Sequence, residues 1–244
     1  MVKTKILQLI NQKSKQIAVL IDPEKCQDVD QLKKLIDKAK FAEVDFLFIG
    51  GSTVSRHEME QTVSFIKEHS EIPLVIFPGA SHQISEKADA LLYLSLISGR
   101  NPDYLIGHHV QSALELHKMD LEIIPTGYIL IDGGTKSSVA YVSQTTPIPR
   151  ENISILKQTA IAGKLLGKKI LYLDAGSGAA QPVPLKMISE LKELEIPIIV
   201  GGGISEINTI HSMHEAGAQI VVIGNKLEED IDFLLDIKSY HQQL

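Results

Sequence analysis

The stretch at residues 170–179, Ile-Leu-Tyr-Leu-Asp-Ala-Gly-Ser-Gly-Ala, runs from apolar residues through an acid into a Gly-Ser-Gly turn. Such a run is typical of a buried parallel strand whose carboxyl end enters an anion-binding loop. Two similar junctions follow at residues 198–203 and 220–225, where runs of isoleucine and valine meet glycines. We therefore expect three neighbouring strands that end at one phosphate site.

Segments typical of strands and helices alternate along the 244 residues. The predicted strands are residues 17–21, 44–49, 73–77, 90–96, a part of 122–131, 169–174, 197–200 and 219–223, and the predicted helices are residues 30–42, 56–68, 104–117, 153–166, 184–194, 206–216 and about 228–240. The strands are apolar almost throughout, which indicates a parallel sheet buried on both faces. This order predicts an α/β fold, a (βα)8 TIM barrel formed as one domain by residues 1–244, with a leading helix in residues 1–15 beneath it.

Residues 132–150 are the one irregular region, with Gly133-Gly134, a stretch rich in serine and threonine, and two prolines. A loop of this length after a barrel strand is more often functional than not. The alternative is a surface excursion used in contacts between subunits.

Composition excludes several classes of protein. The formal net charge of −6 argues against a nucleic-acid binder, which would normally carry a basic face. The single cysteine, Cys26, cannot form an internal disulfide and is expected to be structural, which suits the reducing cytoplasm. No apolar run is long enough to span a bilayer, and the first residues do not form a signal peptide. We therefore expect a cytoplasmic enzyme of metabolism.

Glycines at the last three strand ends are the candidate phosphate ligands, because backbone N–H groups converge on an anion where no Cβ blocks its approach. Gly202, Gly203, Gly224 and Asn225 match the phosphate cradle that many barrels build after strands seven and eight, and Ser177 adds a hydroxyl. The alternative is that these glycines only permit tight turns. Asp174, beside the cradle, is a candidate to accept a hydrogen bond or a proton from a substrate hydroxyl, or else to cap a loop.

Asp22, at the end of the first predicted strand, is the candidate metal ligand, with the Ser52 hydroxyl at the end of the second. Mg²⁺ prefers hard oxygen ligands and often takes only one or two from protein. The alternative for Asp22 is a turn carboxylate before Pro23. The nine histidines supply no zinc set, although His211 and His214 are spaced to contact a common partner on a helix.

Taken together, these segments resemble the geranylgeranylglyceryl phosphate synthase family of prenyltransferases. The resemblance spans the chain in order, through residues 20–25, 49–52, 128–131, 146–150, 172–178, 200–204 and 224–225. The long middle loop is similar to that of the branch with bacterial members, which tends to form larger oligomers. One departure is Asp174, where the family commonly has a glutamate one methylene longer.

The resemblance implies an activity and a set of residues. It implies that Mg²⁺ on Asp22 and Ser52 holds the diphosphate of a prenyl donor, with geranylgeranyl diphosphate the expected donor, and that the C3 hydroxyl of sn-glycerol 1-phosphate attacks the first carbon of the chain. The implied acceptor-binding residues are Tyr172, Leu173, Asp174, Ala175, Gly176, Ser177, Gly178, Gly202, Gly203, Gly224 and Asn225. Asp22 and Asp174 are the implied catalytic residues.

The same resemblance implies a homo-oligomer, a transient membrane-surface contact for product release, and an apolar groove for the prenyl tail. Candidate groove residues are Phe77, Leu94, Leu96, Ile97, Tyr104, Tyr128 and Ile129. Two other functions stay open. One is another phosphate-metabolite barrel enzyme, such as an isomerase or a heterocycle synthase, which shares the cradle but needs no groove. The other is a barrel that binds or assembles without catalysis.

Overall fold

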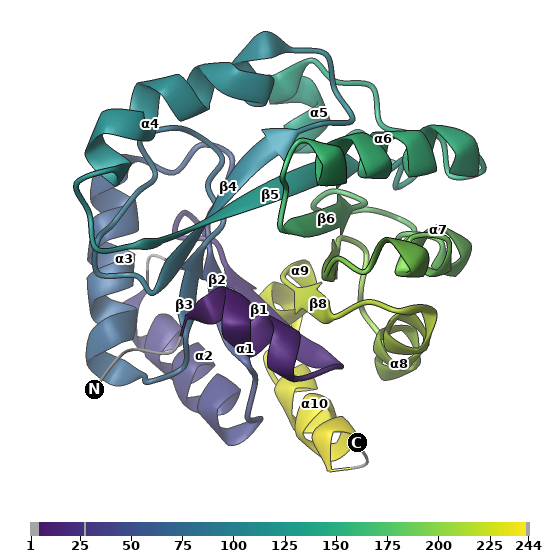
Figure 1. The fold of residues 1–244 in the computed structure, drawn as a ribbon. Coiled ribbons are helices and arrows are strands. Elements are labelled where there is room, and N and C mark those ends of the chain that lie inside the picture. Colours follow the sequence, from purple (N-terminus) through teal and green to yellow (C-terminus); the bar gives the residue numbers. More distant parts are fainter. Residues whose placement is uncertain (1–4, 27, 243–244) are drawn as a thin grey trace.

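The computed structural model describes residues 5–26 and 28–242 and shows a closed barrel of parallel strands in the order β1 to β8 (Figure 1). The strands are β1 (Gln16–Ile21), β2 (Phe46–Ile49), β3 (Leu74–Ile76), β4 (Ala90–Leu96), β5 (Glu122–Leu130), β6 (Ile170–Asp174), β7 (Ile198–Gly201) and β8 (Ile220–Ile223). The barrel closes where β8 pairs with β1, with Ile220 opposite Gln16. The predicted TIM barrel is confirmed.

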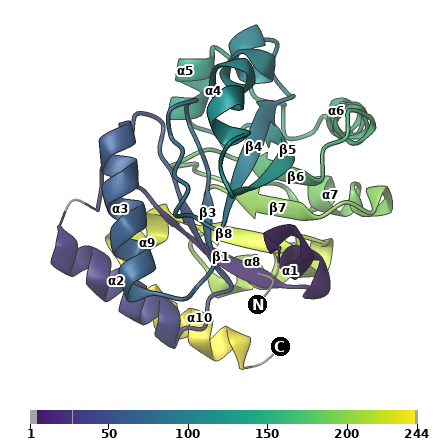
Figure 2. The same ribbon diagram turned by 60° about the vertical axis from the view of Figure 1, so that its left-hand side comes forward.

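Helices surround the sheet, as Figures 1 and 2 show from two directions. They are α1 (Ile6–Gln12), α2 (Val29–Phe41), α3 (Arg56–His69), α4 (His108–Leu116), α5 (Ser138–Ser143), α6 (Ile153–Leu165), α7 (Leu185–Ser189), α8 (Ile207–Ala216), α9 (Asn225–Glu229) and α10 (Phe233–His241). Among the described residues, none of these helices is both long and apolar enough to cross a membrane.

Local differences from the sequence prediction concern helix ends and loops. The predicted helix at 184–194 is α7 followed by a 3-10 turn, Lys192–Leu194. The predicted helix at 104–117 begins as a π-helix, Asp103–Gly107, and the predicted last helix is divided into α9 and α10. The irregular region at 132–150 contains the short helix α5, which Ser137 caps by accepting a hydrogen bond from the Ala140 N–H. No helix follows β3: residues 77–89 reach β4 through turns, so α3 is followed around the barrel by α4.

Each strand buries both faces, which explains the continuous apolar runs in the sequence. In β1, Ala18 points into the barrel with Phe46 and Phe48 of β2, whereas Ile17 and Val19 pack outward under the helices. All five of these side chains are at most 1% exposed. The barrel interior is therefore a packed core in its lower part, and ligands have room only above it.

The amino-terminal end of the barrel is covered by α1, which crosses in front of the strands in Figure 1. Ile6 and Ile10 are buried in the interior cluster. The carboxylate of Glu122, at the start of β5, accepts hydrogen bonds from the N–H groups of Ile6 and Leu7. These donors would otherwise be unpaired at the helix start. The expected leading helix is present in the described residues, and residues 1–4 of that prediction lie outside them.

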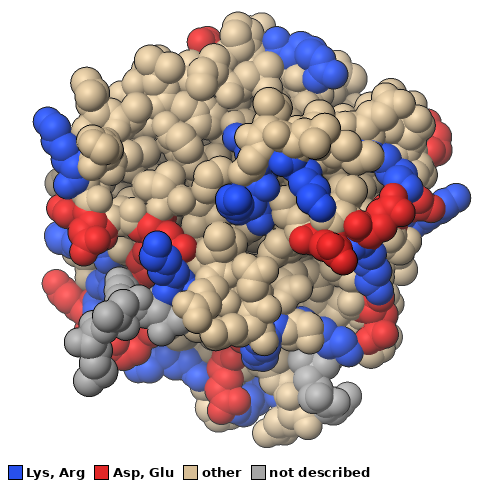
Figure 3. Space-filling view, in the orientation of Figure 1, with Lys and Arg blue, Asp and Glu red and all other residues tan. Residues whose placement is uncertain are grey.

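The surface charges are mixed. On the face in Figure 3, lysines and arginines alternate with acids instead of forming one basic patch. Many charged side chains of the protein form ion pairs, such as Lys38 of α2 with Asp232 and Arg56 of α3 with Glu115 of α4. Exposed pairs of this kind contribute little to stability.

A buried histidine joins α8 and α10 to the barrel. His214 donates from Nε2 to the Gln16 carbonyl (3.0 Å) and accepts at Nδ1 from the Tyr240 hydroxyl (2.8 Å). His211 also contacts the Tyr240 ring, so the two histidines share a partner, as their spacing predicts. Burial lowers the pKa of His214 from 6.5 to about 4. The neutral ring is therefore the form that stabilises the fold.

We expect this histidine to make the fold sensitive to acid. Because its folded-state pKa is depressed, its contribution is complete above pH 6.5 and is lost as the pH falls toward about 4. The free energy of unfolding, measured by urea titration, should fall by about 3 kcal/mol from this group over that range. His214→Phe should be less stable at neutral pH but should show a shallower decline. An equal slope in both proteins would contradict the assignment.

Candidate functional site

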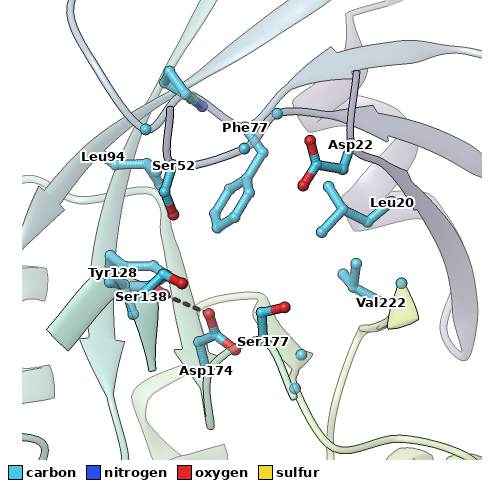
Figure 4. Close-up of a pocket in the computed structure, with 18 of the residues that line it drawn as sticks. Leu20, Asp22, Ser52, Phe77, Leu94, Tyr128, Ser138, Asp174, Ser177 and Val222 are labelled. Carbon is cyan, nitrogen blue, oxygen red and sulfur yellow. Dashed lines mark hydrogen bonds between the residues drawn. The ribbon is translucent and has the colours of Figure 1, made fainter. Parts of the chain in front are cut away.

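A cavity of about 550 Å³ opens at the carboxyl ends of the strands. It is lined at one side by Asp22 and Ser52, which follow β1 and β2. It is lined at the other by Asp174, the last residue of β6, and by Ser177 in the loop that follows (Figure 4). Phe77, after β3, lies between Ser52 and Asp22 in that view. The cavity therefore collects the strand-end residues that the sequence singles out.

The loops after β6 and β7 approach so closely that glycine is required at Gly202. A Cβ there would lie 2.7 Å from both Asp174 Oδ1 and the Gly176 nitrogen, and its φ of +86° strains any other residue. The N–H of Gly176 donates to the same carboxylate oxygen (2.8 Å). The two loops thus form one rigid surface of backbone groups at the cavity wall.

Asn225 connects that surface to the loop after β8. Its Oδ1 accepts hydrogen bonds from the Ser177 hydroxyl (3.0 Å) and the Gly178 N–H (3.3 Å). The residue also begins α9, the short helix behind the eighth strand. The structure therefore brings Ser177, Gly178, Gly202 and Asn225 together at one end of the cavity, where the sequence predicts a phosphate cradle.

Both oxygens of Asp174 have hydrogen-bond donors. Oδ1 accepts from Gly176, and Oδ2 accepts a short hydrogen bond from the hydroxyl of Tyr128 on β5 (Figure 4). Burial raises the pKa of Asp174, and the Tyr128 hydrogen bond lowers it in part. Burial raises the pKa of Tyr128 far above its usual value, with the Asp174 charge adding to the shift. Tyr128 is thus the proton donor of this pair.

Tyr128, expected from the sequence as a residue of the apolar groove, also donates its hydroxyl to Asp174, a contact that the sequence does not predict. In the register of β5 and β6, Tyr128 lies opposite Tyr172, and Asp174 lies two residues farther along its strand. The only signal in the sequence is that residues 128 and 174 both lie near strand ends. The contact depends on the strand register, which no local pattern fixes.

Asp22 lies where the sequence predicts, beside the loop after β2. Its Oδ1 accepts from the Glu24 N–H (3.1 Å), and a Cβ at Gly51 would lie 2.7 Å from this oxygen. Burial raises the pKa of Asp22. The described residues contain no cluster of three or more His, Cys, Asp or Glu side chains that could hold a metal. The carboxylate and the Ser52 hydroxyl, both facing the cavity, nevertheless fit Mg²⁺, which needs few protein ligands.

Most of the candidate acceptor-binding residues line the cavity, and three do not. Leu173 is fully buried beneath the helices, Ala175 donates its N–H to the Gly201 carbonyl, and Gly176 is turned toward Asp174. The lining members of the set are Tyr172, Asp174, Ser177, Gly178, Gly202, Gly203, Gly224 and Asn225. The three others shape the loop from behind the cavity wall.

The cavity has a second, largely apolar arm on the side where β3 lacks a following helix. Its walls come from β4, from α4 and from residues between β3 and β4, including Ile84, Leu91, Tyr93, His109, Ser112 and Leu116. Of the predicted groove residues, Ile97 and Ile129 pack in the outer core instead of lining the cavity. Phe77, Leu94, Leu96, Tyr104 and Tyr128 line it. Ser138 and Val139, from the loop at 132–150, also line the cavity.

Comparisons with known proteins agree with this architecture. The PcrB family model matches residues 8–240. The chain is 48% identical over 229 residues to a geranylgeranylglyceryl phosphate synthase of Flavobacterium johnsoniae, covering 93% of this chain and 94% of that protein. It is 49% identical over 215 residues to the enzyme of the same name from Zunongwangia profunda, covering 88% and 91%.

A solved structure gives the same result. The crystal structure of (S)-3-O-geranylgeranylglyceryl phosphate synthase from Thermoplasma acidophilum, in complex with its substrate sn-glycerol-1-phosphate, superposes with a TM-score of 0.92 at 30% identity. The alignment covers 99% of this chain and 100% of that one. The fold, the strand-end cavity and these matches lead to one conclusion: the chain belongs to the PcrB family, among homologues that are geranylgeranylglyceryl phosphate synthases.

Proposed function

We propose that this protein is a Mg²⁺-dependent prenyltransferase that joins geranylgeranyl diphosphate to the C3 hydroxyl of sn-glycerol 1-phosphate. The observation that carries the proposal is a single cavity with a phosphate cradle and a buried acid at one end and an apolar arm at the other. An isomerase or heterocycle synthase of the same fold needs the cradle but not the arm. Membership in the PcrB family supports the transferase over an isomerase or a heterocycle synthase.

The cradle of Ser177, Gly178, Gly202 and Asn225 is the proposed site for the acceptor's phosphate. Backbone N–H groups and a hydroxyl suit a phosphate because they bind its oxygens without requiring a full positive charge. A phosphate bound here would replace Asn225 Oδ1 as the acceptor for the Ser177 hydroxyl and the Gly178 N–H. Asp174 lies beside this cradle and faces the cavity. The acceptor's hydroxyls would therefore lie near the carboxylate when its phosphate is bound.

The proposed reaction forms one bond and breaks one. The acceptor's C3 oxygen bonds to C1 of the prenyl chain, the bond from C1 to the diphosphate oxygen breaks, and its electron pair leaves with pyrophosphate. The hydroxyl proton passes to a base, for which Asp174 is the candidate. Asp22 and Ser52 would hold Mg²⁺, which would stabilise the charge on the leaving diphosphate. The apolar arm excludes water from the allylic chain.

The implied homo-oligomer, the cytoplasmic location and the transient membrane contact stay predictions. Large apolar side chains are exposed on α4 and at the end of α6, including Val110, Leu114, Leu165 and Leu166, which follows α6. Such faces are typical of surfaces that pack against another molecule. The identity of that molecule is a separate question from the chemistry of the cavity.

The activity is tested by incubating the protein with radiolabelled sn-glycerol 1-phosphate, Mg²⁺ and prenyl diphosphates of different lengths. We expect a lipid-extractable ether product, identified by mass spectrometry, with geranylgeranyl diphosphate as the best donor. The sn-3 enantiomer should give little product, because its hydroxyl meets the buried acid with the wrong orientation. Absence of a lipid product with every donor would refute the proposed function.

Asp22→Asn tests the metal site. The variant should lose at least about 100-fold in turnover, because an amide holds Mg²⁺ less well than a carboxylate. Binding of sn-glycerol 1-phosphate, measured by calorimetry, should be unchanged, since its proposed cradle is built from other residues, after β6, β7 and β8. Glu24→Gln provides a control for a lost charge on the same loop. Wild-type turnover in Asp22→Asn would remove this residue from the mechanism.

Tyr128→Phe tests Asp174 as the base. If the carboxylate must be ionised, activity is present above its pKa and falls as the pH falls through it. Loss of the Tyr128 hydrogen bond removes a contact that lowers this pKa, so the acid limb of the profile of kcat against pH should move to higher pH. Tyr172→Phe is the matched control, because Gly176 and Tyr128 are the donors to Asp174 in the described chain. An unshifted limb in Tyr128→Phe would exclude Asp174 as the titrating base.

A further inference from the structure

A lysine and a glutamate meet across the mouth of the cavity. The Nζ of Lys25, in the turn after β1, lies 2.9 Å from both carboxylate oxygens of Glu228 on α9. The Lys25 N–H donates to the Asp22 carbonyl (3.0 Å), so the turn holds the lysine next to the candidate metal ligand. Both Lys25 and Glu228 line the cavity. This ion pair therefore joins the first and the last βα junctions above the site.

The cavity mouth contains more acids than bases. Of the described residues that line it, the lysines are Lys25 and Lys226, and no arginine is present. Lys226 pairs with Asp230 (3.2 Å) and lies over the Phe233 ring, 5.6 Å from its centroid, so its charge is already engaged away from the cavity. The lining acids are Asp22, Glu24, Asp174, Glu228 and Glu229. A strongly anionic ligand entering here would therefore meet Lys25 as the cation beside Asp22.

Another anion can replace Glu228 as the partner of Lys25. The two side chains are 42% and 32% exposed, and ion pairs this accessible to water are weak. A diphosphate carries more charge than a carboxylate and presents more acceptor oxygens. A phosphate group that arrives next to Asp22 can therefore replace Glu228 as the partner of the lysine.

We propose that Lys25 binds the diphosphate of the prenyl donor, and that Glu228 is the partner it exchanges for that diphosphate. Glu228 keeps the lysine extended across the mouth while the site is empty, and it competes for the lysine when pyrophosphate is ready to leave. Lys25 is thus a donor-binding residue and Glu228 a positioning residue. The inference rests on the proposed function and names the residues that handle its donor.

The two residues should affect pyrophosphate binding in opposite directions. Lys25→Met removes a charged hydrogen-bond donor and should weaken binding at least about tenfold. Glu228→Gln frees the lysine from its competitor and should tighten binding about two- to fivefold. A role limited to holding the fold together would weaken binding in both variants.

The experiment is isothermal titration of the full chain with sodium pyrophosphate in the presence of MgCl₂. Glu229→Gln is the matched control, because it removes the same charge one residue farther along α9. No described residue forms an ion pair with Glu229. Lys25→Arg should retain binding within about threefold, since the charge is kept. Thermal unfolding of each variant, followed by circular dichroism, verifies that the barrel is intact.

Each outcome decides between the alternatives. Unchanged pyrophosphate affinity in Lys25→Met would overturn the binding role. Weaker binding in Glu228→Gln, or equal tightening in Glu228→Gln and Glu229→Gln, would overturn the exchange, because the latter would reflect net charge alone. The titration requires no turnover, so its result is independent of whether an ether lipid is formed. A protein that makes the lipid can fail this test, and one that makes none can pass it.

Discussion

The close approach of two peptide backbones at the ends of β6 and β7 is the constraint on which the rest of the site depends. Gly202 lies against Asp174 and Gly176 with no space for a side chain. This contact fixes the orientation of the buried carboxylate and aligns the backbone of the cradle with it. The same loops reach Asn225 through Ser177 and Gly178, so the position of the acid and that of the anion site are set together. Preorganisation of this kind costs little during the reaction, because these groups are already oriented when the protein folds.

Most of the fold could be predicted from the sequence, because the strands are apolar almost throughout and alternate with helical segments. β4 was predicted to the residue, and α6 differs from its prediction by one residue. Residues 77–89 and 132–150 were harder to predict. Neither contains a long periodic pattern, and α5 is stabilised by its cap and by contacts with the barrel mouth, not by a strong amphipathic signal.

The candidate site could be predicted at the level of strand ends but not at the level of contacts. Asp22, Asp174 and the glycines are visible because parallel strands place their carboxyl ends at one edge. The hydrogen bond from Tyr128 to Asp174 joins two residues that are 46 positions apart in the sequence. The ion pair of Lys25 with Glu228 joins two residues that are 203 positions apart. Contacts at such separation depend on barrel closure and side-chain rotamers. In the sequence, nothing distinguishes Lys25 from a solvated surface lysine. Its contact with Glu228 is visible only when α9 is placed in the fold.

Because no helix follows β3, this barrel can keep a packed core and still have space for a long ligand. The interior below the cavity is filled by Ile6, Ala18, Phe46 and their neighbours, and a TIM barrel cannot be hollowed there without losing its core. The apolar arm instead leaves sideways, between β4 and α4. The dimensions of a long ligand are therefore set in the outer layer, by side chains such as Tyr93 and Ser112. Evolution can lengthen or shorten that space by substitutions that leave the eight strands and their packing untouched.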